Sequence, residues 1–133
     1  MEDIRELRIG NWVRDVSGFS MYVQSLYDED TVYLDFPENG GDTWEENISE
    51  VEPIEIEESL LKQLGFRQIP DWEYFLEGFV EGALIYYDLS DHTLTILTKR
   101  ATLHHLDIKH LHQLQNCLFD FAHKEIADHD IFT

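Results

Sequence analysis

The sequence predicts an α+β fold, with a small SH3-like antiparallel β-barrel in residues 1–56 and an α-β-β-β-α unit in residues 57–133. Three observations predict it. Short strand patterns separated by turn residues fill the first part, helix patterns occur near residues 55–66 and 108–126, and strand patterns lie between these helices. A chain of 133 residues suits one domain, so we expect the two parts to form one compact unit.

The strand pattern is clearest in TVYLDF (31–36), where apolar residues occupy every second position, as in a strand with one buried face. Residues 8–15 and 20–27 are bounded by turn residues and also predict strands, and residues 43–56 can supply two more. The loop PENGGD (37–42) interrupts the pattern, because proline cannot continue a ladder and glycine permits positive φ. Five short strands in succession favour a small barrel.

The second part begins with EIEESLLKQLGF (55–66), which predicts a short helix with acids at its start and Gly65 in the left-handed position after its end. Three strand patterns follow, at residues 71–78, 82–89 and 92–99. The stretch RATLHHLD (100–107) is interpreted as the connection to the last helix, with Asp107 as the N-cap of that helix.

The last helix lies in KHLHQLQNCLFDFAHKEIADH (109–129), which contains four histidines. Its leucines and phenylalanines share one wide arc of the helix and predict a core face. His110 and His112 are two residues apart and face opposite sides, and no His-x3-His pair occurs in the chain. We therefore expect these histidines to bind no metal and no cofactor.

Gln115 is the unexpected residue of that arc, because it lies between Leu111 and Phe119. A buried amide without a partner costs about 1–3 kcal/mol, so we expect Gln115 to hydrogen-bond to strand or loop backbone. Asn116 and His112 lie at the rim of the arc. We predict that Gln115, Asn116 and His112 form a structural polar network.

The charge of the chain is its strongest bulk signal, with 28 Asp and Glu against nine Lys and Arg, or a net charge of −19. Residues 1–60 hold 17 of the acids and three of the bases. Such a field repels nucleic acid and anionic membranes, but it attracts and steers basic protein surfaces. The predicted acidic interaction face consists of Asp28, Glu29, Asp30, Asp35, Glu45 and Glu46. The alternative is that the acidity only maintains solubility.

The remaining composition suggests a cytoplasmic protein. No apolar run is long enough to span a bilayer, and the N-terminal residues do not form a secretory signal. A single cysteine, Cys117, excludes an internal disulfide. Of the tryptophans Trp12, Trp44 and Trp72, we expect two to lie in the core and at most one to serve in binding.

Three segments carry a resemblance: ELRIGNWV (6–13), VEPIEI with LLKQLGF (51–66), and LHQLQNCLFDFAHKEI (111–126). Together they resemble a family of small uncharacterised proteins of bacteria, prophages and mobile elements. Its members have Leu-Arg-Ile-Gly-Asn-Trp/Tyr-Val near the N-terminus and His-Gln-Leu-Gln-Asn on the last helix. The chain departs from this family at CLFDF (117–121), at AHKEI (122–126) and in its greater acidity. The resemblance implies a bacterial or phage context and brings no activity, cofactor or catalytic residue.

We therefore expect a non-enzymatic acidic module that binds a protein with a basic surface, with no direct contact to nucleic acid or membrane. One version is a nucleic-acid mimic or an inhibitor of host defence. Two alternatives stay open. One is a small ligand- or metal-binding domain or enzyme that uses His104, His105 and His112, and the other is a structural accessory protein of a mobile element. The sequence leaves the oligomeric state open.

Overall fold

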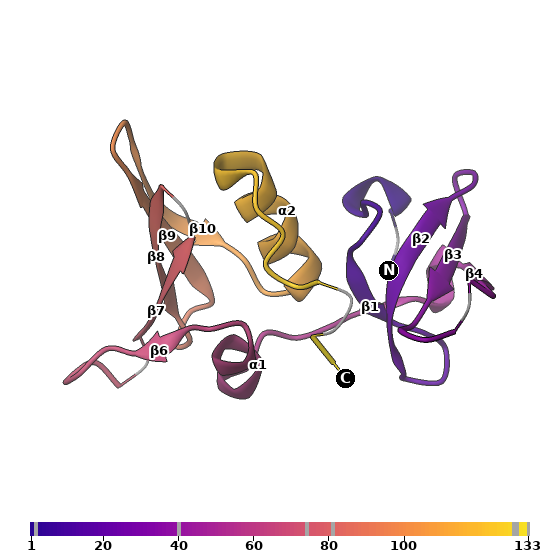
Figure 1. The fold of residues 1–133 in the computed structure, drawn as a ribbon, viewed down its shortest axis with the longest axis horizontal. Coiled ribbons are helices and arrows are strands. Elements are labelled where there is room, and N and C mark those ends of the chain that lie inside the picture. Colours follow the sequence, from indigo (N-terminus) through magenta and orange to yellow (C-terminus); the bar gives the residue numbers. More distant parts are fainter. Residues whose placement is uncertain (2, 40, 74, 81, 129–130, 133) are drawn as a thin grey trace.

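The computed structural model describes residues 1, 3–39, 41–73, 75–80, 82–128 and 131–132. Over these residues the chain forms two antiparallel sheets and two α-helices, which confirms the predicted α+β class. The helix α2 (Leu111–Ala122) lies between the two sheets, and the shorter helix α1 (Glu58–Gln63) follows the first sheet (Figure 1). The last helix therefore brings the chain back to a position from which it can contact both sheets.

The first sheet contains the five strands predicted for the first part, in the order β4-β3-β2-β1-β5. Their bounds are β1 Trp12–Arg14, β2 Ser20–Leu26, β3 Thr31–Asp35, β4 Trp44–Asn47 and β5 Glu52–Pro53. Two 3-10 helices, η1 (Ile4–Glu6) and η2 (Ile48–Glu50), precede β1 and β5. Val32 and Leu34 are buried, while Tyr33 between them faces outward, as a period of two requires. In the described pairings β4 and β5 are the edges of a curled sheet, so closure into an SH3-like barrel stays a prediction.

The second sheet contains five strands among the described residues, in the order β10-β9-β8-β7-β6, so the three strands of the predicted α-β-β-β-α unit are too few. Their bounds are β6 Arg67–Gln68, β7 Phe75–Val80, β8 Ala83–Asp88, β9 Thr93–Thr98 and β10 Thr102–Asp107. The strand β10 lies in the stretch interpreted as a connection. Its register against β9 shifts between Leu103 and Leu106, and His105 there has a φ of +55°. This bulge interrupts the alternation of inward and outward side chains, so the sequence pattern of a strand is lost there.

Both helices are shorter than their sequence patterns. Gly65, after the end of α1, has a φ of +98°, which confirms the predicted left-handed position. Asp107 does not cap α2, because it pairs with Thr93 as the last residue of β10. The helix instead begins at Leu111, and its N-cap is His110.

The residues before α2 are held by the segment that leaves the first sheet. The Ile56 N–H donates to the carbonyl of Lys109 at 3.1 Å, and the Leu111 N–H donates to the carbonyl of Ile54 at 2.9 Å. The side chain of Gln113 accepts from the N–H groups of Lys109 and His110, so it satisfies backbone donors at the start of its own helix. This pairing fixes where α2 starts.

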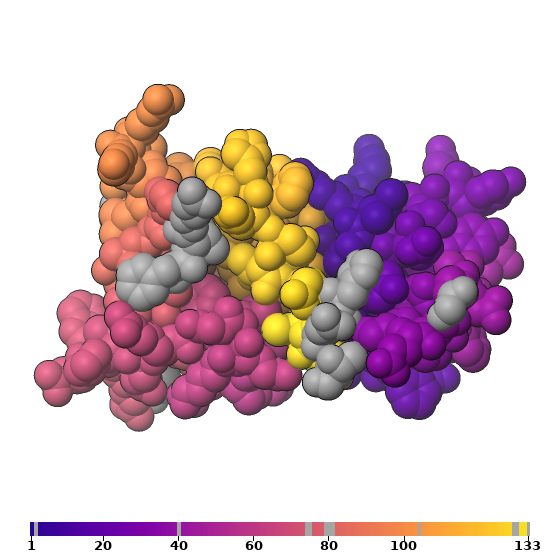
Figure 2. Space-filling model, viewed as in Figure 1, coloured from indigo at the N-terminus to yellow at the C-terminus, as the bar shows by residue number. Residues whose placement is uncertain are grey.

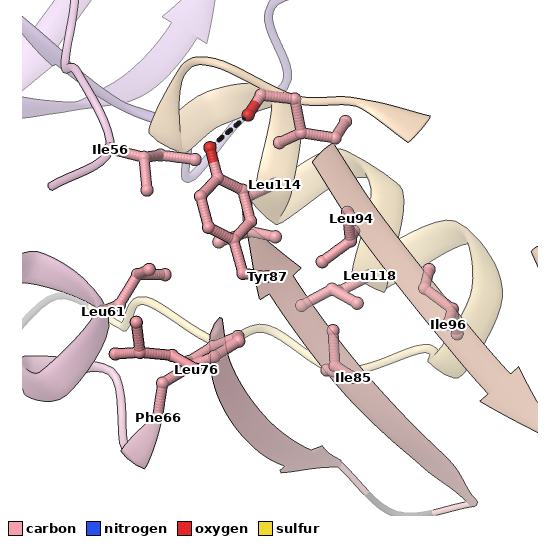
Figure 3. Packing of buried hydrophobic residues seen from close by; sticks show 11 residues of the cluster. Ile56, Leu61, Phe66, Leu76, Ile85, Tyr87, Leu94, Ile96, Leu114 and Leu118 are labelled. Carbon is pink, nitrogen blue, oxygen red and sulfur yellow. Dashed lines mark hydrogen bonds between the residues drawn. The ribbon is translucent and has the colours of Figure 1, made fainter. Parts of the chain in front are cut away.

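The main core lies between α2, α1 and the second sheet, as Figure 3 shows. It contains Ile56, Leu61, Phe66, Leu76, Ile85, Tyr87, Leu94, Ile96, Ile108, Leu114 and Leu118. Tyr87 is fully buried, and its hydroxyl donates to the carbonyl of Ile108 at 2.5 Å. Burial, together with nearby acids of which Asp107 contributes most, raises the pKa of Tyr87. A second core, inside the first sheet, contains Leu7, Val13, Met21, Val23, Val32, Leu34, Ile48 and Val51.

A third cluster around Trp12 joins the two halves. The Trp12 ring is fully buried and contacts Phe132 edge-on, with ring centroids 4.8 Å apart. The Trp12 Nε1–H donates to the carbonyls of Ala127 and Asp128, both at 3.1 Å. Leu111 of α2 belongs to the same cluster. In Figure 2, atoms of α2 and of the segment after it fill the space between the two halves on the face shown.

Gln115 confirms its predicted role, because it is 1% exposed and bonds to backbone of the first sheet. Its Oε1 accepts the N–H of Trp12 at 2.9 Å, and its Nε2 donates to the carbonyl of Gly10 at 3.1 Å. The Nε2 also donates to the carboxylate of Glu125 at 2.9 Å, which in turn accepts the N–H of Ala127. One amide therefore links β1, α2 and the segment after α2.

Asn116 extends this network as predicted. Its Oδ1 accepts the side-chain amide of Asn11 at 2.8 Å, and its Nδ2 donates to the carbonyl of Glu6 at 3.0 Å. One turn further along α2, Asp120 forms a two-bond ion pair with Arg8, at 2.7 and 3.0 Å. The segment before β1 is thus fastened along one side of α2.

We predict that Gln115→Leu lowers the free energy of unfolding by about 1–3 kcal/mol, because the buried N–H of Trp12 and carbonyl of Gly10 lose their partner. Urea denaturation followed by circular dichroism measures this loss. Gln24→Leu, on the exposed side of β2, is the matched control and should change stability by no more than about 0.5 kcal/mol. Equal effects of the two substitutions would contradict the role assigned to Gln115.

Candidate interaction surface

Four of the six predicted acids are exposed, three in the β2–β3 turn and one on the outer face of β4. Asp28, Glu29 and Asp30 form the turn, and all three are exposed. Glu45 is exposed on β4 directly opposite Tyr33, whose hydroxyl donates to the Glu45 carboxylate at 3.2 Å. We call Asp28, Glu29, Asp30 and Glu45 the acidic face.

Asp28 builds the turn as well as contributing charge. Its Oδ1 accepts the backbone N–H of Asp30 at 2.9 Å and of Thr31 at 2.8 Å. These bonds, that of Asp30 first, lower the pKa of the Asp28 carboxyl, so it is ionised at neutral pH. Beside it the exposed Tyr27 contacts Tyr33 edge-on, with centroids 6.2 Å apart. The acidic face therefore includes a carboxylate held in a fixed position.

Two of the six predicted acids do not belong to this face. Asp35 is 4% exposed and Glu46 is 8% exposed, so their assignment to an exposed surface is wrong. The Oδ1 of Asp35 accepts the N–H of Phe36 and the side-chain amide of Asn39, both at 2.8 Å. The carboxylate of Asp35 therefore bonds within the β3–β4 loop. Glu46 pairs with the buried Val32 and therefore shares the core-facing side of the sheet.

A groove of about 680 Å³ opens at the first sheet. Its lining residues are Asp15, Ser17, Phe19, Ser20, Met21, Phe36, Trp44 and Phe132. Phe19, Trp44 and Phe36 expose 68%, 53% and 38% of their surface. Clustered apolar side chains that stay in contact with water inside a concave surface mark sites of interaction. We call this feature the aromatic groove.

Carboxylates lie at the base of the β1–β2 loop, beside the groove. Asp15 is 8% exposed, and its Oδ1 accepts the N–H groups of Ser17 at 3.0 Å and Phe19 at 2.8 Å. Burial raises the pKa of Glu46, with smaller contributions from the charges of Asp15 and Glu50. A hydrogen bond from the Val16 backbone N–H acts in the opposite direction on the Glu46 pKa, and Glu46 does not line the groove, so Asp15 is the acid that the groove itself presents.

The groove is not among the features predicted from the sequence, which place two of the three tryptophans in the core. Trp12 alone is buried, while Trp44 and Trp72 are both more than half exposed, so that prediction is wrong. The signal was present in the neighbours of Trp44. The stretch TWEEN has no other apolar residue, so a strand there has no apolar face to bury.

His104, His105 and His112, which the alternative ligand-binding prediction uses, lie on two different elements. His105 is exposed in the bulge of β10, and His112 is buried in the first turn of α2. The side chain of His104 lies outside the described residues. Within the described part of the chain, no three His, Cys, Asp or Glu side chains gather as metal ligands would. In that same part, no helix has the length and apolar character needed to cross a bilayer.

His112 does not take part in the predicted polar network. It is 2% exposed, and neither ring nitrogen has a hydrogen-bond partner among the described residues. Its ring stacks on that of His110, with centroids 5.8 Å apart and planes 9° apart. Burial, and to a smaller extent the charge of His110, lowers the pKa of His112 to about 4. His112 is therefore neutral at physiological pH and packs as an apolar ring.

Comparisons with known proteins found no match to this chain, whether among protein-family models, curated proteins or solved structures. The resemblance to a bacterial and prophage family therefore stays a prediction from its motifs.

We predict that burial of His112 makes the protein lose stability in mild acid. The unfolded chain protonates His112 near pH 6.5 and the folded protein only near pH 4, so the unfolded state takes up the proton first. The stabilisation present above pH 6.5 falls by about 3 kcal/mol as the pH drops to 4. Urea denaturation at a series of pH values measures this loss.

His112→Phe removes the titrating group and keeps an aromatic ring. The difference in unfolding free energy between pH 7 and pH 4 should shrink by about 3 kcal/mol in this variant. His123→Asn is the control, because His123 is exposed after α2 in a left-handed conformation that asparagine readily adopts. A pH profile unchanged by His112→Phe would show that His112 has the same pKa in the folded and unfolded chain, which would contradict the effect of burial.

Proposed function

We propose that this protein is a non-enzymatic, cytoplasmic interaction module that binds a basic surface of a partner protein. The charge distribution of the first sheet supports this proposal. Between Arg14 and Lys62 the chain has 14 acidic residues and no lysine, arginine or histidine. Four of these acids form the exposed acidic face. A surface field of one sign, without interspersed cations, attracts and orients an oppositely charged partner.

Mimicry of nucleic acid is one version of this function. In this version the basic surface of the partner normally binds phosphates, and the carboxylates of the acidic face take their place. The resemblance to bacterial and prophage proteins favours a partner from host defence or nucleic-acid machinery. The same negative charge opposes direct binding of this chain to nucleic acid.

Capture of partners from the native cell, identified by mass spectrometry at a series of salt concentrations, tests the proposal. We expect captured proteins with basic surfaces, released as salt rises from about 50 to 500 mM, because screening shortens the range of the field. The triple variant Asp28→Asn, Glu29→Gln, Asp30→Asn should weaken binding of the captured partner at least about tenfold at the lowest salt. The asparagine at position 28 retains the oxygen that accepts the turn N–H groups.

A control variant with the same change in net charge separates the acidic face from bulk acidity. Asp71→Asn, Glu73→Gln and Asp107→Asn neutralise three exposed acids of the second half. These substitutions should weaken binding by less than about twofold, because their distance from the acidic face exposes them to screening. Binding that resists 500 mM salt, or equal losses in the two triple variants, would exclude the proposed function.

A further inference from the structure

The aromatic groove is a concave apolar surface, which attraction of a partner by long-range charge alone would not need. Phe19 is supplied by the β1–β2 loop, Phe36 by the end of β3 and Trp44 by the start of β4, so three separate segments place exposed aromatic rings at one hollow. Its volume of about 680 Å³ falls in the range of ligand sites, roughly 300–1,000 Å³. A partner that fills this hollow removes much apolar surface from water.

One carboxylate oxygen in the groove is free to bind. Asp15 uses only Oδ1 for the loop, where it accepts the N–H groups of Ser17 and Phe19. Its Oδ2 has no hydrogen-bond partner among the described residues. Asp15 is nonetheless more than nine-tenths buried. The Oδ2 is not among the buried polar atoms that lack a partner, so it is open to solvent at the groove, and a donor that carries positive charge can replace water there.

The chain does not supply that positive charge in the groove. No lysine, arginine or histidine is present among the described lining residues. Arg14 is the basic residue closest in sequence, and its guanidinium donates to the carbonyl of Gly18 at 3.3 Å. Asp15 is thus an acid that lines the groove without a basic side chain among the other described lining residues. A cation from outside would complement its charge.

We propose that the aromatic groove binds an extended segment of the partner protein that carries an arginine. The arginine guanidinium contacts Asp15 and the ring of Trp44, and apolar neighbours of the arginine pack on Phe19 and Phe36. This inference rests on the proposed function, since it names the chemistry by which the basic partner is recognised.

Arginine fits this site better than lysine for physical reasons. Its guanidinium is planar and weakly hydrated, stacks on aromatic faces, and donates two parallel bonds to a carboxylate. The lysine ammonium is compact and strongly hydrated, so it loses more on entering an apolar hollow. An anionic group would meet Asp15 and the negative field of the first sheet, which excludes phosphate-bearing ligands.

Three matched peptides test the inference: acetyl-Ala-Leu-Arg-Leu-Ala-amide and its lysine and citrulline versions. Citrulline keeps the shape of arginine and removes its charge. The indole Nε1–H resonance of Trp44, followed by NMR during titration, reports occupancy of the groove. We expect saturable shifts with the arginine peptide, and affinity at least about tenfold weaker for citrulline, with lysine between them.

Two variants and one control assign the site. Asp15→Asn keeps the oxygen that holds the loop and removes the charge, and Trp44→Gln removes the ring. Each substitution should weaken the affinity for the arginine peptide at least about tenfold. Binding to Trp44→Gln is followed through the amide resonances of Phe19 and Met21. Trp72→Gln, at an equally exposed tryptophan of the second half, should leave affinity unchanged. Circular dichroism verifies that each variant is folded. If Asp15→Asn proves to be unfolded, the comparison of Trp44→Gln with Trp72→Gln still tests the site.

Several results would overturn the inference: no saturable shift, equal affinity for the arginine and citrulline peptides, or equal losses in Trp44→Gln and Trp72→Gln. Shifts that depend on protein concentration without peptide would mean that a second copy of the chain fills the groove. If the peptides do not bind while the acidic-face variant still binds the captured partner more weakly, only the assignment of the groove is wrong. If the acidic-face variant binds that partner with normal affinity, the proposed function is wrong instead.

Discussion

The amide of Gln115 occupies the position on which the arrangement of the two halves depends. The strand β5 pairs with Val13 and Arg14 but not with Trp12, so β1 leaves a buried N–H beyond the end of its partner strand. Gln115 accepts that N–H from the middle of α2. Leu114 and Leu118 of the same helix pack in the core of the second sheet. The backbone N–H of Trp12 in β1 is therefore bonded by a helix that packs against the second half of the chain.

This attachment determines which part of the first sheet is left for binding. Helix α2 and the segment after it cover the β1 side, through Gln115, Asn116 and the backbone of Ala127. The acidic face and the Trp44 side of the groove belong to β2–β4, toward the opposite edge of the sheet. The fold thus leaves the β2–β4 part of the first sheet exposed, with Glu45 of the acidic face on one side of β4 and Trp44 of the groove on the other side.

The sequence predicted much of the fold because most strands follow simple rules. Alternation and turn residues located all five strands of the first sheet, and the position of Gln115 within an apolar arc indicated a bonded, buried amide. The strand β10 is not predicted from the sequence, because a bulge at His105 interrupts the alternation of apolar and polar side chains. The start of α2 was misplaced because backbone pairing with Ile54–Ile56, a contact between distant residues, overrides a good N-cap at Asp107.

The candidate site was less accessible to sequence reasoning. Asp35 and Glu46 looked like the other acids, and only strand pairing and loop geometry reveal that they are buried. The groove needs three segments to converge, which no local pattern encodes. His112 illustrates the same limit, because its ring is buried without a partner among the described residues although it lies on the rim of the predicted arc.

Native-state hydrogen exchange tests most directly whether Gln115 makes the two halves one cooperative unit. The account predicts that the Trp12 amide exchanges with the same free energy of opening as the amides of Ile85 and Ile96 in the second sheet, because α2 must detach before either is exposed. A Trp12 amide that opens at a free energy several kcal/mol below those of β8 and β9 would contradict it, since the first half would then open on its own.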